Sequence, residues 1–320
     1  MIIDVHTHTP SHYKNIHKSE EQYDTKMRPD RPIKMTNSVE EYLQDMLPVN
    51  IAIVFGIARH PLKNDALDHL NFVHDVNDRT AEVVSLGSGK LIGFMSVHPD
   101  SDGVLDEVYR CKSDLNLRGI KLGPNYQNFD PLGLNAKSLY AYAEKNNIPL
   151  IFHQGTAPMA NSPLRYSYPI YMDEIALLFP DLKIVMAHMG HPWHEDCIAV
   201  IRKHKNVYAD ISGQFYRPWS AYNGFRLAFE WNVMHKLLFA SDWPVTTPSE
   251  TITFLNGLPS YCRKYNLPVI PFSEINGIMN RNSLELLEID LKLNLFKFTQ
   301  QISRAFTDWL PSGESIHVIT

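Results

Sequence analysis

The sequence predicts an α/β fold of the TIM type, an eight-stranded (β/α)8 barrel, and two observations carry this prediction. Eight short apolar runs, rich in Ile, Val, Leu or Phe, recur along the chain. Runs of this kind are typical of strands that are buried on both faces of a parallel sheet. The segments between the runs place apolar residues three and four positions apart, which is the spacing of helices.

The alternation of eight predicted strands with helical segments favours a closed barrel over an open sheet. An open, doubly wound sheet would need a glycine-rich phosphate-binding turn after an early strand. The chain contains no G-x-G-x-x-G sequence. A closed barrel is therefore the simplest architecture for this alternation. The runs are residues 2–5, 51–57, 91–97, 119–122, 149–153, 183–188, 206–211 and 236–241.

We expect one catalytic barrel domain over residues 1–290, with two additions. Residues 9–37 form a polar, proline-containing insertion that is too long for an ordinary loop between a strand and a helix. The insertion follows the first strand, at the end of a barrel where active sites lie, so it is either an active-site lid or a surface excursion. Residues 291–320 form a C-terminal extension, and its aromatic segment predicts an amphipathic helix.

Composition narrows the class of protein. The chain has 320 residues, of which 44% are hydrophobic and 20% charged, as in ordinary globular proteins. Its net charge of −5 gives no indication of nucleic-acid binding. Three widely spaced cysteines argue against a disulfide framework, and no secretory signal or long apolar run stands out. We therefore expect a cytoplasmic protein that binds neither membranes nor nucleic acid.

Histidine and aspartate residues stand where several predicted strands end. His6 and His8 are two positions apart on the first strand, so their side chains point to the same side. The carboxyl ends of all strands of a barrel face one mouth, so residues that end separate strands converge there. The later strands contribute Lys121, His153, His188 and Asp242.

These residue types suit a metal ion. Imidazole and carboxylate groups bind Zn²⁺, Mn²⁺ or Fe²⁺. Three histidines and one aspartate can hold one ion and leave a position for water, whose pKa the ion lowers toward about 7. A further histidine can polarise a substrate or move a proton. Taken alone, any of these histidines can be structural and Asp242 can be a turn residue, but their convergence favours a site.

Four sequence segments resemble the amidohydrolase superfamily. They are HTH at 6–8, FHQGT at 152–156, AHMGHPW at 187–193 and ASDWP at 240–244. The resemblance is closest to the amidohydrolase-2 branch, which includes aminocarboxymuconate-semialdehyde decarboxylase and related decarboxylases. It runs from Met1 to about Leu287.

The resemblance implies roles for individual residues. The metal ligands would be His6, His8, His153 and Asp242, with Asp242 also accepting a proton and His188 acting on water or substrate. In two-metal members of the superfamily a carboxylated lysine bridges the ions. Lys121 fits that position, and His188 would then bind the second ion. An unmodified Lys121 would instead bind an anionic group of the substrate. We therefore expect one divalent ion, zinc first with manganese or iron as alternatives, and a second if Lys121 is carboxylated.

Five further residues are candidates for contact with a small-molecule substrate around the mouth. Each of them is also an ordinary loop or packing residue. They are Arg59, His191, Trp193, Tyr216 and Arg217.

Three functions remain open at this point. The leading one is metal-dependent hydrolysis of an amide, lactone or related ester bond in a small molecule. The second is non-oxidative decarboxylation of an aromatic or muconate-type acid, although ASDWPVTTP lacks the Phe-Glu continuation associated with the aromatic-acid decarboxylases. The third is a non-catalytic barrel, which the complete ligand set disfavours. The aromatic C-terminal segment also leaves open a homo-oligomer.

Overall fold

A computed structural model describes residues 1–12, 17–61, 76–157 and 159–290 of the chain. The predicted helix of the C-terminal extension, at 291–320, lies outside the described residues.

All eight apolar runs form parallel strands, as the sequence predicts. The third run supplies two short strands, separated by Phe94. In order, the strands are β1 (Ile3–His8), β4 (Ile51–Phe55), β5 (Leu91–Gly93), β6 (Met95–Ser96), β7 (Ile120–Leu122), β8 (Leu150–Phe152), β9 (Ile184–Met186), β10 (Val207–Asp210) and β11 (Leu237–Leu238).

The strands pair as two sheets, in the orders β1-β4-β5 and β11-β10-β9-β8-β7-β6, rather than as one closed sheet. Backbone hydrogen bonds nevertheless join the two sheets at both seams. At one seam, Phe94 N donates to Val54 O and Met95 N donates to Gly119 O, at 2.9 and 2.8 Å. At the other, Val5 N donates to Phe239 O at 3.0 Å. The strands therefore surround one core, which is the TIM-barrel arrangement.

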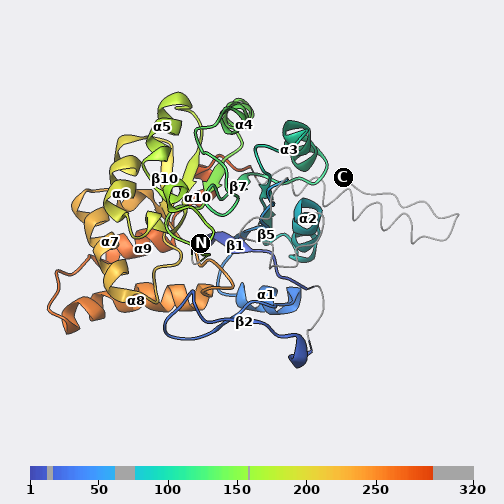
Figure 1. The fold of residues 1–320 in the computed structure, drawn as a ribbon. Coiled ribbons are helices and arrows are strands. Elements are labelled where there is room, and N and C mark those ends of the chain that lie inside the picture. The colour runs from blue at the N-terminus through green and yellow to red at the C-terminus, as the bar shows by residue number, and fades with distance from the viewer. Residues whose placement is uncertain (13–16, 62–75, 158, 291–320) are drawn as a thin grey trace, which may run out of the picture.

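Helices surround the strands in chain order, from α1 in blue to α8 in orange (Figure 1). Two of them begin with capping boxes, at Ser38 with Glu41 and at Thr247 with Glu250. The helices are α1 (Val39–Asp45), α2 (Val76–Leu86), α3 (Val104–Ser113), α4 (Leu134–Lys145), α5 (Tyr171–Leu178), α6 (His194–Lys203), α7 (Pro218–Glu230), α8 (Pro248–Lys264), α9 (Phe272–Met279) and α10 (Ser283–Leu286). Short 3-10 helices lie at η2 (Leu164–Ser167), η3 (Ala187–Gly190) and η4 (Met234–Lys236).

The apolar core has two layers, and β4 shows how the sequence divides between them. Ile53 and Phe55 point into the barrel, where they join an inner cluster with Ile151. Ala52 and Val54 point outward into the layer that the helices cover. This alternation follows from the two-residue period of a strand, and it explains why the runs are apolar throughout.

The insertion after β1 lies against the loops that follow β10 and β11. Its described part contains η1 (Lys18–Glu20) and an antiparallel pair, β2 (Tyr23–Asp24) and β3 (Ile33–Lys34). Arg28 is 6% exposed and donates to Val245 O and to Glu250 Oε1, at 3.0 and 3.1 Å. Arg31 pairs with the same Glu250 at 2.8 Å. These bonds hold the insertion at the mouth, and its action as a lid stays a prediction.

Across the part of the chain that the structure describes, no helix is long and apolar enough to cross a bilayer.

Ile151 tests the inner apolar cluster. Its side chain is 0% exposed, so Ile151→Ala leaves a cavity and should cost about 2–5 kcal/mol of unfolding free energy. Leu177→Ala is the matched control, because Leu177 is 61% exposed and its loss should change stability by less than about 0.5 kcal/mol. Denaturant unfolding of both variants measures the difference. Equal losses would contradict the two-layer core.

Candidate metal centre

The structure brings the predicted ligands together at the carboxyl ends of the strands. Asp242 Oδ1 lies 3.3 Å from His6 Nε2 and 3.2 Å from His8 Nε2. On the other side of the cluster, His188 Nε2 lies 3.2 Å from His153 Nδ1. The ligand atoms of His6, His188 and Asp242 all lie within 4.8 Å of one another.

These separations fit a metal ion. Tetrahedral zinc, with bonds of about 2.0–2.1 Å to nitrogen, places neighbouring ligand atoms about 3.3 Å apart. Three of the contacts within the cluster have this length, at 3.3, 3.2 and 3.2 Å. The chemistry of the donors, imidazole nitrogen and carboxylate oxygen, is equally suitable for zinc.

A buried carboxylate, Asp210, fixes the tautomer of His6. Asp210 ends β10, is 0% exposed, and its Oδ2 lies 2.8 Å from His6 Nδ1. A carboxylate only accepts, so His6 donates from Nδ1. Burial, reinforced by the charge of Lys121, lowers the pKa of His6 and keeps the ring neutral. A neutral ring has a single N–H, so Nε2 carries a lone pair that faces Asp242.

The same carboxylate fixes His188 through a serine. The Ser212 hydroxyl donates to Asp210 Oδ1 at 2.5 Å. Having given its proton there, Ser212 Oγ accepts from His188 Nδ1, which lies 2.8 Å away. His188 therefore also turns a lone pair, on Nε2, toward the cluster. Burial lowers the pKa of His188 and keeps this ring neutral.

The backbone around His188 has an unusual conformation that aims the ring. His188 and Met189 have φ angles of 58° and 48°, in the left-handed region that side chains rarely adopt. Hydrogen bonds compensate: His188 N donates to Asp210 Oδ1 at 2.9 Å, and Gln214 Nε2 donates to His188 O at 2.5 Å. Gly213 is needed opposite, because an added Cβ would lie 3.0 Å from His188 Nδ1.

Lys121 is fully buried beside the cluster. Its Nζ lies 3.3 Å from His6 Nε2 and 4.8 Å from the centre of the Phe55 ring. Burial lowers its pKa to about 8, against the charges of Asp210 and Asp242, which raise it. The side chain is therefore placed for either predicted role, as a bridge between metal ions if the amine is carboxylated or as a partner of a substrate anion if it is not.

Of the predicted mouth residues, three lie close to the cluster. The His191 ring is 5.7 Å from the His188 ring, and burial, with the charge of Arg217, lowers its pKa to about 4. The pKa of Tyr216 is raised by burial and then by Asp242, and the Arg217 guanidinium stacks on the Tyr216 ring at 4.5 Å.

The other two predicted mouth residues have different surroundings. Trp193 precedes α6 and packs on Tyr168, with ring centres 5.5 Å apart. Arg59 is half-buried in the loop that follows β4.

Sequence reasoning missed Asp210, Ser212 and Gln214. Asp210 lies one position before the end of the seventh apolar run, close to where other runs carry predicted ligands, so its place in the sequence could have identified it. Ser212 and Gln214 act only through contacts with His188, which no spacing in the sequence shows.

A second histidine and aspartate group lies outside this cluster. His60, His98 and Asp100 bring ligand atoms within 4.8 Å of one another. Both nitrogens of His98 are engaged, with Gln127 O at 2.9 Å and Asp100 N at 3.1 Å. This group is therefore better explained as part of the loop framework.

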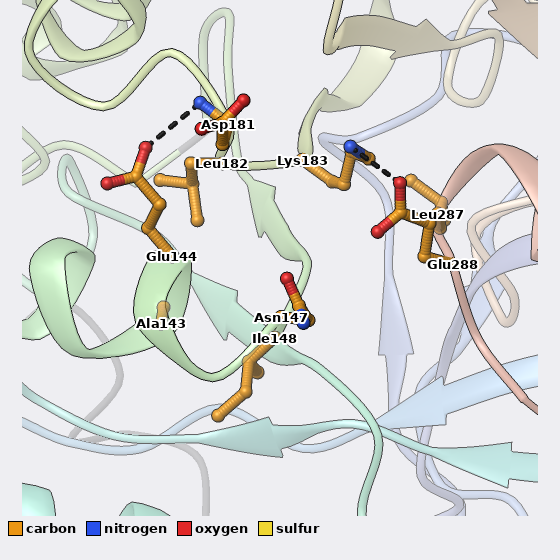
Figure 2. A pocket seen from close by; sticks show the side chains of 9 residues that line it. All are labelled: Ala143, Glu144, Asn147, Ile148, Asp181, Leu182, Lys183, Leu287 and Glu288. Atoms are coloured by element: carbon orange, nitrogen blue, oxygen red, sulfur yellow. Dashed lines mark hydrogen bonds and ion pairs between the residues drawn. The ribbon is translucent and has the colours of Figure 1, made fainter.

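A small pocket lies at the opposite end of the barrel (Figure 2). Lys183, which precedes β9, pairs with Glu288 at 2.9 Å on its wall. Active sites of β/α barrels lie at the carboxyl ends of the strands, so this pocket is not the centre of the chemistry.

Comparison with known families agrees with this geometry. The family model Amidohydro_2, described as amidohydrolase, matches residues 3–289. The chain belongs to the amidohydrolase-2 family. It is therefore an enzyme of the amidohydrolase superfamily, a metal-dependent family that acts on small molecules. The resemblance read from the sequence motifs is confirmed, and so is the TIM-barrel fold class. The search of curated proteins found no significant match.

Solved structures share the fold. An uncharacterised TIM-barrel protein from Bordetella bronchiseptica has a TM-score of 0.63 at 20% identity, over 90% of this chain and 98% of that one. A probable 2-pyrone-4,6-dicarboxylic acid hydrolase from Acinetobacter baumannii, with citric acid bound, has a TM-score of 0.56 at 14% identity, over 90% and 99%. A dihydroxybenzoic acid decarboxylase from Polaromonas sp. JS666, with bound manganese and an inhibitor, has a TM-score of 0.59 at 14% identity, over 90% and 98%.

Asp210→Asn tests the control of the two imidazoles. The Asn amide can donate as well as accept, so it no longer requires His6 Nδ1 and Ser212 Oγ to act as donors. Zinc affinity should therefore fall about 10- to 100-fold. Asp173→Asn is the matched control, because Asp173 also pairs with a histidine, His204 at 2.6 Å, but away from the cluster. Competition with a chelating dye measures both affinities. Unchanged affinity in Asp210→Asn would refute the assignment.

Elemental analysis of zinc-loaded protein tests the role of Lys121. We expect about one ion per chain, both in the wild type and in Lys121→Ala, because the predicted ligands His6, His8, His153 and Asp242 suffice to hold one ion. Lys183→Ala, which removes a lysine from the far end of the barrel, is the control. Two ions that fall to one in Lys121→Ala only would instead identify Lys121 as a bridge.

Proposed function

We propose that the chain is a metal-dependent hydrolase that cleaves an amide, lactone or related ester bond in a small molecule. One observation carries this proposal. His6 Nε2 and Asp242 Oδ1, which both present lone pairs, lie 3.3 Å apart in a buried site. A divalent cation between them would accept both lone pairs, in competition with Lys121 Nζ, which lies 3.3 Å from the same His6 Nε2. When bound, such an ion supplies Lewis acidity and lowers the pKa of a water toward about 7.

The proposed ligands are His6, His8, His153 and Asp242. Zinc is the first choice, since histidine nitrogen with carboxylate oxygen is a typical zinc donor set. Manganese remains an alternative, because the decarboxylase of the same fold holds manganese. His153 offers two ligand atoms: Nδ1, which lies 3.2 Å from His188 Nε2, and Nε2, which is buried with no partner among the described residues.

Asp242 is the proposed proton carrier. Its Oδ1 contacts His6 and His8, and the residue is 9% exposed, so it faces both the ion site and the mouth. Burial raises its pKa, which favours holding a proton during transfer to a leaving group. The φ angle of 63° at Asp242 shows that the surrounding backbone holds this side chain in place.

His188 is proposed to accept rather than donate. Its Nδ1 hydrogen is committed to Ser212, so Nε2 presents a lone pair to the site. The ring can therefore orient a water by accepting its hydrogen or can bind a metal. A neutral His188 in this tautomer cannot donate to an oxygen of the substrate from Nε2.

Decarboxylation of an aromatic or muconate-type acid is the second candidate. The observation that favours it is the buried amine of Lys121, 3.3 Å from His6, which can pair with a substrate carboxylate. The likeness between the fold of this chain and that of a dihydroxybenzoic acid decarboxylase also supports decarboxylation.

Paired assays test the proposed function. Zinc-loaded protein should hydrolyse at least one member of a panel of lactones, N-acyl amino acids and aryl esters. Chelation should abolish the activity because no protein group replaces the ion, and added zinc should restore it. CO₂ release from aromatic acids is measured in parallel. Metal-dependent CO₂ release without hydrolysis would replace the first candidate by the second.

A further inference from the structure

A tyrosine that the sequence motifs do not include occupies the inside of the mouth. Lys121 lies on β7 and points into the barrel. Gly123 follows two positions later, just beyond the strand, and therefore faces the same side. Gly123 has no side chain, and the Tyr126 ring fills the space. A Cβ added at Gly123 would lie 1.9 Å from two ring carbons of Tyr126 and 2.4 Å from its hydroxyl. The ring therefore sits one layer above Lys121.

Tyr126 lies against the metal-ligand cluster. Its ring centre is 4.9 Å from that of His153, and the ring joins the apolar cluster inside the barrel. The residue is 6% exposed. Within the described residues, the buried hydroxyl has no hydrogen-bond partner. A buried hydroxyl without a partner is unfavourable, so it is expected to find one when a ligand is present.

The loop that carries Tyr126 is held rigidly. Gln127 Oε1 accepts from Gly123 N at 2.7 Å, and Gln127 N donates to Gly123 O at 2.8 Å. The Gln127 amide also donates to Ala58 O and Val97 O, at 2.8 and 3.1 Å. The two bonds with Gly123 close the loop after β7 on itself, and the two bonds of the amide tie it to two neighbouring loops. The hydroxyl is thus preorganised, which is the property that makes a hydrogen-bond donor effective in catalysis.

We propose that Tyr126 is a further catalytic residue, whose hydroxyl donates a hydrogen bond to the substrate oxygen that gains negative charge. The inference rests on the proposed function, because it takes a carbonyl or carboxylate compound as the substrate. It also supplies what His188 lacks, since the His188 tautomer leaves no N–H toward the site. Asn125 on the same loop and Gln154 just after β8 also have buried side-chain amides without partners among the described residues, which favours a substrate with several polar atoms.

Phenylphosphonate, a tetrahedral oxyanion, is the probe for this donor. We expect it to bind the zinc-loaded full-length protein in a calorimetric titration. Tyr126→Phe should weaken binding roughly 10- to 100-fold, the range for a hydrogen bond to a charged group. Zinc content should stay at the wild-type value, because the hydroxyl is not a ligand.

Tyr140→Phe is the matched control. Tyr140 is 0% exposed on α4, and its hydroxyl also has no partner in the described part of the chain, but it lies in the outer layer. This variant should bind the probe like the wild type. Equal binding by Tyr126→Phe and the wild type would overturn the inference, and so would a wild type that does not bind phenylphosphonate.

The outcome separates this inference from the proposed function. Tyr126-dependent binding of phenylphosphonate without hydrolysis of any panel substrate would keep the donor and remove the hydrolase. Hydrolysis that Tyr126→Phe leaves unchanged would keep the hydrolase and remove the donor.

Discussion

The arrangement of the candidate metal-ligand cluster depends on one buried carboxylate. Asp210 accepts from His6 directly and from His188 through Ser212, so a single charge orients two imidazoles on different strands. Each ring then directs its other nitrogen toward Asp242 or His153. Without that constraint, either ring could adopt the other tautomer and present an N–H, instead of a lone pair, to the cluster.

The barrel makes this constraint possible, because it brings together strand ends that are far apart in the sequence. His6 and Asp210 are separated by 204 positions, and His8 and Asp242 by 234. Backbone hydrogen bonds at the two seams fix the register between these strands. The inner apolar cluster beneath the site excludes water and lowers the local dielectric constant. Electrostatic interactions and hydrogen bonds among the polar groups above it are therefore stronger than in water.

The sequence predicted the fold, and it predicted that the residues at the strand ends would lie together, because strand ends converge in any β/α barrel. The tautomers, the role of Ser212 and the place of Tyr126 could not be predicted in this way. Tyr126 is three positions beyond Gly123 on a loop, and its ring enters the mouth only because Gly123 leaves the space. The division of the third run into β5 and β6 also depends on pairing at the seam, which no local pattern shows.

The insertion after β1 shares one carboxylate with the start of α8. Glu250 accepts from Arg28 and Arg31 and also completes the capping box with Thr247. Movement of the insertion away from the mouth would therefore separate Glu250 from both arginines, whereas Arg28 would keep its ion pair with Asp30. The first turn of α8 would then depend on Thr247 and Glu250 alone. The rate of amide hydrogen exchange in the first turn of α8 should therefore rise whenever the insertion leaves the mouth of the barrel.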